Sequence, residues 1–564
     1  ESAEQAAEFG MPAALADVMR RHLENPGMQA DAALALGMIL NAAPGCATKA
    51  AEAGVANVLL SALHRYPESP EVGLAVGIAL GSLLEKYPRC ASKIAEARSV
   101  HTIVGLMQMH AENPAVQAAG CQVLAQLFWR QPACVAVAKA AKAPELLLDA
   151  LATHPNDAGV QGNASSAVAW LLTADAASAE YVATEGGPEL LTAVLRKHIR
   201  TRFTQEAASQ ALRQLILSCP EELAGNAAAE AAKFGAAQLL VASLRRDPSG
   251  SSVQQQVSLA LETLCLHHNA SAAVAVEAGA QQLLAASYRR HHAEEWVQAS
   301  CMCALAQLVD SYPAGAAGAI AVGAVELFRE ALRNHVGDGH SQDVMSSSLA
   351  QLLVERLRAE VLLCPLGEEA AADDAEAGEG SPDSECIVAW RARLLEVLEQ
   401  MQELFLKHST STVGAASVDV TRALVSVLRA DAGNCLVQAA AAKVVVMLLQ
   451  RHPASAAPAA EYGAGELLLK SLSLHLDKAD VQAQACHALG MLMQENPAST
   501  EALWEAQLEG QLAKALERHP GVEDVKYGVM KAFKMLQKYV PPEPEEPDKP
   551  EEDDLDVWLG LKPA

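Results

Sequence analysis

A spacing of 44 residues recurs along most of this 564-residue chain. One marker is a glycine, or a residue replacing it, ahead of an apolar run. A second is a valine, usually followed by glutamine. Both keep one register, except for a gap of 49 between Gly186 and Gly235. The first marker stands at Gly10, Gly54, Arg98, Lys142, Gly186, Gly235, Gly279, Gly323, Gly463 and Gln507, and the second at Val72, Val116, Val160, Val253, Val297, Val437, Val481 and Val525. Such a repeat predicts stacked structural units rather than one compact core.

Each unit reads as helices. A short helix precedes the glycine, a second such as "VANVLLSALHRY" (55–66) follows it, and a Pro- or Gly-bearing turn leads to a third such as "EVGLAVGIALGSLLEKY" (71–87). Apolar residues spaced i, i+3, i+4 and i+7 indicate amphipathic helices, and proline and glycine mark their ends. The apolar surface comes mainly from Ala and Leu, both strong helix formers, since aromatics are only 4% of the residues.

The string "EAGVANVLLSALHRYPESPEVGLAVGIALGSLL" (52–84) resembles an armadillo repeat in its Ala-Gly, Leu-Leu and Ala-Leu-x-x-Leu positions. The resemblance extends over roughly residues 1–540 and fits the 40–47-residue period of that class. It implies an all-α, right-handed α-solenoid of about eleven armadillo-type repeats, in which the third helices line a continuous concave groove.

The composition divides the chain into four parts. Residues 1–366 hold the first eight units, and we expect the chain to begin part-way through a repeat. Residues 367–386 carry eight acids and no base, which predicts a disordered insertion. Residues 387–540 contain an irregular unit, starting with an amphipathic helix over 387–408, and the C-terminal repeats. Residues 541–564 form an acidic tail whose apolar cluster is a candidate linear interaction motif or a segment that folds back, with Leu555, Trp558 and Leu559 at its centre.

Residues that occupy the same repeat position in successive units form a column, and the columns of the third helices indicate what the groove could bind. Arrays resembling importin-alpha carry asparagine and tryptophan columns that hold basic peptides, and neither column is present here. Glutamines and tryptophans occupy the central units instead, and methionines the last ones. Amides both donate to and accept from a peptide backbone, and tryptophan and methionine offer apolar contacts. The alternative is packing between repeats. We call these residues the groove set: Gln122, Gln126, Trp129, Trp170, Gln210, Gln214, Met447, Met491 and Met535.

Eight histidines recur where the second helix ends. Histidines one repeat apart cannot reach a single metal ion, so the column predicts no metal site. We interpret each histidine as a hydrogen-bonding group for the final carbonyls of its own helix. The column comprises His22, His110, His154, His198, His291, His335, His475 and His519.

Basic residues precede that column in units five to eight. Their positive charges have two possible roles. They could stabilise the negative ends of helix dipoles, or they could bind an acidic segment, from a partner or from the chain's own insertion or tail. Arg200 and Arg202 flank the row. We define the basic ridge as Arg196, Lys197, Arg245, Arg246, Arg289, Arg290 and Arg333.

Several functions are disfavoured. The chain lacks the Walker, nucleophile-elbow, HExxH and CxxC motifs, so we expect no catalytic site, cofactor or small-molecule substrate. A net charge of −26 without interleaved aromatics argues against nucleic acid. No apolar run approaches the length of a membrane span. Twelve cysteines without a disulfide pattern indicate a reducing compartment, hence the cytoplasm.

The sequence therefore predicts a non-enzymatic interaction scaffold or adaptor that binds an extended segment of a protein, or another scaffold subunit, in the groove. Two alternatives stay open. The chain could be a structural component of a cytoskeletal or ciliary (axonemal) assembly, or the regulatory repeat region of a larger enzyme.

Overall fold

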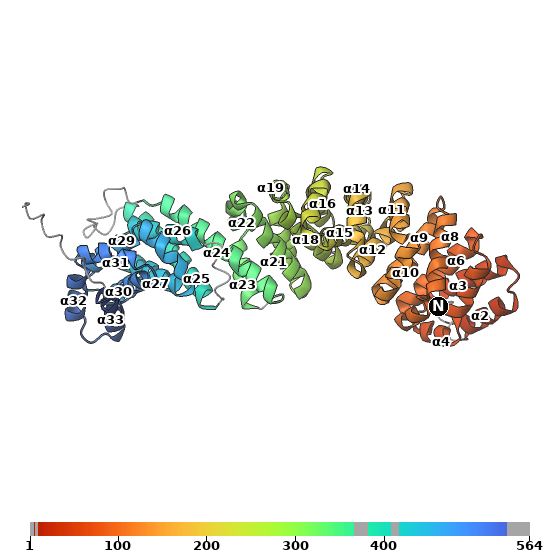
Figure 1. The fold of residues 1–564 in the computed structure, drawn as a ribbon, viewed down its shortest axis with the longest axis horizontal. Coiled ribbons are helices and arrows are strands. Elements are labelled where there is room, and N and C mark those ends of the chain that lie inside the picture. The colour runs from red at the N-terminus through yellow and green to blue at the C-terminus, as the bar shows by residue number, and fades with distance from the viewer. Residues whose placement is uncertain (1–4, 6–8, 335, 366–381, 408–416, 539–564) are drawn as a thin grey trace, which may run out of the picture. The chain divides into compact units, whose positions relative to one another are not determined.

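A computed structural model describes residues 5, 9–334, 336–365, 382–407 and 417–538. The described residues are helical, with turns and short 3-10 segments and no strand. They form two compact units, residues 1–349 and 350–564 within their described parts, and helix α24 (Gly339–Leu362) crosses the boundary. The all-helical armadillo-type architecture expected from the period is confirmed (Figure 1). The number of repeats stays a prediction.

One repeat shows how the sequence produces the fold. Helix α4 (Ala47–Glu52) ends before Gly54, whose φ of 76° is a left-handed conformation that glycine adopts without steric cost. Helix α5 (Val55–Arg65) follows, and Ser69 then caps α6 (Pro70–Lys86), its side chain accepting a hydrogen bond from the Val72 N–H at 3.4 Å. The glycine, the cap and the proline at the first turn of α6 fix where each helix stops and starts.

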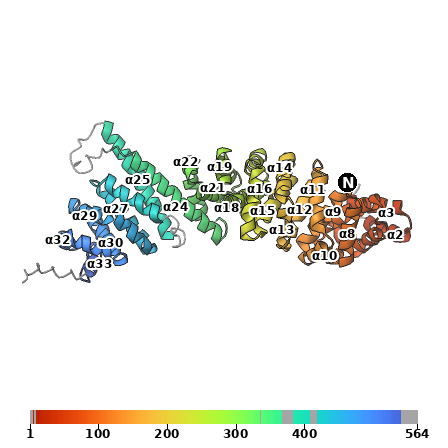
Figure 2. The same ribbon diagram turned by 45° about the horizontal axis from the view of Figure 1, so that its top comes forward.

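The first unit repeats this order (Figures 1 and 2). Its first helices, after α4, are α7 (Ala91–Ile94), α10 (Val135–Ala140), α13 (Ser178–Thr184), α16 (Glu221–Lys233), α19 (Ala270–Glu277) and α22 (Ala316–Ala321). Its second helices are α2 (Met11–Arg21), α5, α8 (Ala97–Met109), α11 (Ala143–Thr153), α14 (Gly187–Lys197), α17 (Ala236–Arg246), α20 (Ala280–Arg290) and α23 (Ala324–Arg333). Its third helices are α3 (Pro26–Ala42), α6, α9 (Pro114–Arg130), α12 (Ala158–Ala174), α15 (Arg202–Ser218), α18 (Ser251–His267) and α21 (Glu295–Ser311).

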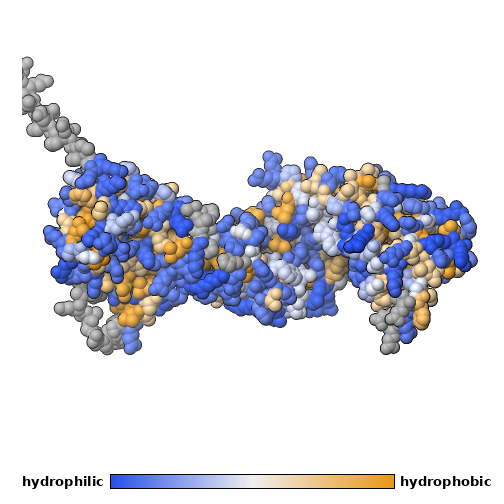
Figure 3. Space-filling view, turned by 90° about the horizontal axis from the view of Figure 1, so that it is seen from below, coloured by the Kyte–Doolittle hydropathy of each residue, from blue (hydrophilic) through white to orange (hydrophobic). Residues whose placement is uncertain are grey.

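Successive third helices pack against one another, from α3 to α21. Small residues allow the close approach: a Cβ added at Gly77 would lie 2.8 Å from the Ala119 Cβ, and one at Gly37 only 3.0 Å from the Ile78 side chain. We call the exposed surface of these helices the third-helix face. On the side drawn in Figure 3, apolar surface lies in separate patches among hydrophilic ones.

Two irregularities of the spacing have structural causes. The five extra residues before Gly235 lengthen α16 to 13 residues, where α10 has 6 and α13 has 7. Arg98 does not occupy a break, because α8 already begins at Ala97 and the chain bends at Glu96 instead. The marker alignment at Arg98 therefore keeps the register of the repeat but not its backbone conformation.

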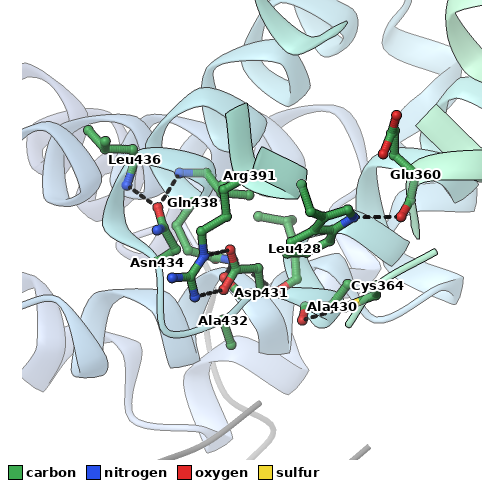
Figure 4. Close-up of polar contacts among 12 residues, drawn as sticks. Glu360, Cys364, Arg391, Leu428, Ala430, Asp431, Ala432, Asn434, Leu436 and Gln438 are labelled. Atoms are coloured by element: carbon green, nitrogen blue, oxygen red, sulfur yellow. Dashed lines mark hydrogen bonds and ion pairs between the residues drawn. The ribbon is translucent and has the colours of Figure 1, made fainter. Parts of the chain in front are cut away.

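The second unit contains α25 (Pro382–Lys407), α26 (Ser417–Ala430), α27 (Cys435–Arg451), α28 (Ala456–Glu461), α29 (Ala464–Leu474), α30 (Ala479–Glu495), α31 (Ala498–Glu505), α32 (Leu508–Arg518) and α33 (Glu523–Leu536). The helix expected over 387–408 corresponds to α25. Trp390 on α25 is fully buried, and its Nε1 donates to the Glu360 carbonyl at 2.7 Å. Arg391 binds the buried carboxylate of Asp431 through two hydrogen bonds of 2.8 Å (Figure 4).

The histidine column works differently from the prediction. In several repeats the ring Nε2 reaches the turn of the preceding repeat, at 2.7 Å from the Ala111 carbonyl for His154 and 3.0 Å from the Pro155 carbonyl for His198. The His110 Nε2, by contrast, is buried without a hydrogen-bond partner among the described residues. A buried glutamine satisfies the helix end instead. The Gln161 Nε2 donates to the carbonyls of Leu151 and His154, and equivalent glutamines do the same in other repeats. The histidine thus connects repeats, and the glutamine of the Val-Gln pair caps the second helix.

Among the described residues, no single helix has the length and apolarity of a membrane span. The bent pair Pro26–Ala42 and Pro44–Glu52 passes that test only when both segments are counted together.

Candidate functional site

The exposed side of α9 carries half of the central groove set. Gln122, Gln126 and Trp129 follow one another at helical spacing, and the residues between them are buried. The Asn113 cap fixes the start of α9, its side chain accepting from the Val116 N–H at 3.3 Å. The sequence therefore places these three side chains on the third-helix face, as predicted for residues that contact a partner.

Two tryptophans from neighbouring repeats meet there. The rings of Trp129 and Trp170 stack with centroids 5.5 Å apart and planes 23° apart. The Arg130 guanidinium lies 4.2 Å from the Trp129 ring centroid, and its Nε donates to the Gln126 Oε1 at 3.2 Å. Trp129 is 48% exposed and Trp170 is partly buried. A large, pre-ordered aromatic surface thus remains open to a ligand, beside a cation.

The other two central glutamines lie on α15. Gln210 and Gln214 are partly buried, and the Gln214 Nε2 donates to the Ser218 hydroxyl at 2.9 Å. Ser218 in turn donates to the Leu172 carbonyl of α12 at 3.2 Å. Gln214 is therefore held in position with its amide oxygen left as an acceptor.

Sequence reasoning missed two exposed leucines. Leu217 on α15 is 45% exposed and Leu266 on α18 is 55% exposed. Both stand at the repeat position of Trp129. The sequence does contain a sign of them, because the repeat position of Trp129 is also apolar in these two units, on a helix side that is otherwise polar.

Two partly buried acids on third helices, Glu262 on α18 and Asp310 on α21, were also missed. Burial raises the pKa of Glu262 to about 7, although the nearby charges of Arg213 and His340 lower it. Burial likewise raises the pKa of Asp310, opposed by a hydrogen bond of 3.0 Å from the Ser348 hydroxyl. A sequence pattern does not give the burial of a single carboxylate, so neither acid could be singled out.

The methionines of the groove set lie in the second unit and differ in exposure. Met447 and Met535 are partly buried, whereas Met491 is 4% exposed and lies in contact with the Lys531 Nζ. Met491 therefore offers little surface to a partner. The exposed methionine of this region is Met530, at 70%.

A cluster of polar groups lies beside Met491. The Lys531 Nζ is 3.3 Å from the His487 Nε2, and the Tyr527 ring meets the His487 ring edge-on at 5.1 Å. Burial, with the charge of Lys531, lowers the pKa of His487 to about 4. His487 is therefore neutral at physiological pH. Burial also lowers the pKa of Lys531, opposed by the charge of Glu495.

The basic ridge is largely structural. In units five to seven its first arginine donates to the carbonyl just before the left-handed glycine of the next repeat. Arg245 reaches the Ala278 carbonyl at 2.6 Å, Arg289 reaches that of Val322 at 2.8 Å, and Arg196 binds that of Phe234. These groups cap the first helix of the next repeat rather than the helix that carries them. They also lie in the last turn of the helices that carry them, so the interpretation as partners of helix-dipole ends stays a prediction.

The remaining ridge residues vary. Lys197 approaches the Asn156 Oδ1 at 3.4 Å, and Arg246 and Arg290 are exposed. The acidic insertion, apart from its last residues at the start of α25, and the tail motif of Leu555, Trp558 and Leu559 lie outside the described residues. No group of three or more His, Cys, Asp or Glu side chains within the described part of the chain is arranged to hold a metal ion.

The chain resembles one family model and several solved structures. The family model described as LRRK2 ARM repeat matches residues 2–196. No curated protein matches the chain. Among solved structures, an engineered protein is 22% identical with a TM-score of 0.37, covering 45% of this chain and 96% of its own. Uso1-2 is 11% identical (TM-score 0.44; 95% and 91% covered). A structure described as a phosphorylation switch controlling the interaction between cadherin and beta-catenin is 14% identical (0.40; 93% and 98%).

The consecutive helix triplets and their regular contacts define an α-solenoid. More particularly, its repeats are of the armadillo type, and residues 2–196 match an armadillo repeat model; this fold commonly mediates protein interaction.

Proposed function

We propose that this protein is a non-enzymatic interaction scaffold whose first unit binds an extended protein segment along the third-helix face, from α9 to α18. The Trp129–Trp170 stack carries the proposal, because a pre-ordered and partly exposed aromatic pair presents its contact area at little entropic cost. Leu217 and Leu266 extend the apolar contact, and the glutamine amides serve the backbone of the bound segment. We place this activity in the cytoplasm.

The test is a peptide-binding measurement. Segments selected on the wild-type chain from a display library would be titrated against Trp170→Ala. We expect binding to weaken by at least about tenfold, as for aromatic hot spots in general. Far-UV circular dichroism should show an unchanged helix content.

The matched control is Trp296→Ala, which removes another exposed tryptophan, at the start of α21. It should leave the affinity unchanged. Equal losses in both variants, or retention of binding by Trp170→Ala, would show that the stack is not the contact surface.

A further inference from the structure

The histidine column is interrupted at the sixth repeat. In neighbouring repeats the ring reaches back to a turn carbonyl, as His291 does to Pro248 at 3.0 Å. Asp247 occupies that position here, and its shorter, acceptor-only side chain cannot serve the equivalent turn at Ile199. The interruption leaves space between two repeats.

A pocket of about 210 Å³ occupies that space. Its lining comes from three segments: the turn before α15 with the first turn of that helix, the end of α17, and the start of α18. We call it the Asp247 pocket, and the residues used below are Ile199, Arg200, Arg202, Arg246, Asp247 and Val253.

The charge of this pocket is positive. Arg202 makes a bidentate ion pair with Asp247, at 2.5 and 2.8 Å. The lining contains two more arginines and no second acid, so their charges are not balanced there. Arg200 and Arg246 are exposed and, within the described part of the chain, have no hydrogen-bond or ion-pair partner. Two guanidinium groups therefore converge on one cavity with their donors available.

The start of α18 adds a second source of anion affinity. Its cap is Gly250, which has no side chain to accept the first N–H groups, whereas Asn113 and Asp157 cap α9 and α12 with their side chains. Val253, in the first turn of α18, lines the pocket. The Asp247 carboxylate lies against this helix start, because a Cβ added at Gly250 would clash with its Oδ2, so the dipole of the 17-residue helix acts on Asp247 as well as on a bound anion.

We propose that the Asp247 pocket binds a phosphate monoester dianion. Arg200 and Arg246 hold the phosphate oxygens, the start of α18 supplies the helix dipole, and Asp247 orients Arg202 beside them. A guanidinium group is planar and can donate two parallel hydrogen bonds to the oxygens of one phosphate, which makes arginine a suitable phosphate ligand. The site lies at a turn between repeats and does not depend on the function proposed for the third-helix face.

Phosphorus-31 NMR titration of the full chain tests the proposal. Inorganic phosphate is one ligand and a short phosphoserine peptide, beside its unphosphorylated form, is the other. We expect saturable binding of phosphate, and roughly tenfold weaker binding for Arg246→Gln because one charge-assisted contact is lost. Arg290→Gln is the matched control, since it removes the exposed arginine at the same position one repeat later. It should leave binding unchanged.

A second variant keeps the result independent of folding. Asp247→His restores the histidine found at this position in most other repeats. Its ring should fill the pocket and hydrogen-bond to the Ile199 carbonyl. Phosphate binding should then be abolished without a lower melting temperature. Tighter binding of the phosphoserine peptide would identify a phosphorylated side chain as the source, and binding of inorganic phosphate alone would identify the free ion. The proposal fails if neither ligand binds, if Arg290→Gln is as damaging as Arg246→Gln, or if Asp247→His still binds.

Discussion

Two residues adopt a backbone conformation that the other repeats assign to glycine. Lys142 has φ 66° and Gln507 has φ 60°, and glycine holds the equivalent position in most other repeats. A side chain in the left-handed region costs about 1–2 kcal/mol, of which the extra entropy of an unfolded glycine offsets about 0.5–1 kcal/mol. We expect Lys142→Gly to raise the free energy of unfolding by about 0.5–1 kcal/mol, measured by urea denaturation. Arg98→Gly is the control. It lies inside α8 and should lower stability, so a gain there would contradict the explanation.

Glu262 gives stability a defined pH dependence. Burial raises its pKa from the ordinary glutamate value of 4.5 to about 7. Between these values the folded chain binds more protons than the unfolded chain, so this group makes the free energy of unfolding fall as the pH rises through that window. Glu262→Gln should therefore stabilise the protein by about 1–3 kcal/mol at pH 8 and by much less at pH 5. Thermal melts at both pH values would measure it, with the exposed Glu277→Gln as control. An equal gain at both pH values would show that ionisation is not the cause.

At the scale of elements, the period and helix spacing predicted the helices because both depend on local chemistry. Apolar periodicity, proline and glycine act within a few residues of where they stand. The same reasoning failed where one repeat touches the next. The partner of Arg245 is the Ala278 carbonyl, 33 residues away, and that of His154 is the Ala111 carbonyl, 43 residues away. A column of similar residues shows that a role repeats, but not which neighbour it serves.

The candidate site divides in the same way. The column reasoning placed Trp129, Trp170 and the central glutamines on the third-helix face, since helical spacing fixes the direction of a side chain. It did not distinguish exposed from buried members, as Met491 shows, because exposure depends on the side chain of the next repeat, here Lys531. The Asp247 pocket was missed for a related reason. It arises where an aspartate replaces the recurring histidine, and reading a column for its recurring residue passes over such a replacement.

At the scale of the whole molecule, stability should be distributed unevenly along the array. Each repeat contacts its neighbours, so a local defect affects nearby repeats first. The acidic composition makes local opening easier. With a net charge of −26, acidic residues repel one another along the whole chain, whereas packing of the third helices stabilises only neighbouring repeats. Single substitutions are therefore expected to open part of a unit before they unfold the protein.

Arg391 tests this expectation. Its bidentate partner Asp431 is 1% exposed, so Arg391→Met would leave a carboxylate buried without its cation. Breaking a buried pair in this way costs about 3–5 kcal/mol, whereas an exposed pair contributes about 0–1 kcal/mol. Hydrogen exchange read by mass spectrometry should show lost protection in α25, α26 and α27, less in α29 and α30, and none in α9 or α12. Arg518→Met breaks the exposed pair with Asp477 and should change little. Uniform loss of protection across both compact units would mean that the array unfolds as one cooperative body, contrary to nearest-neighbour coupling.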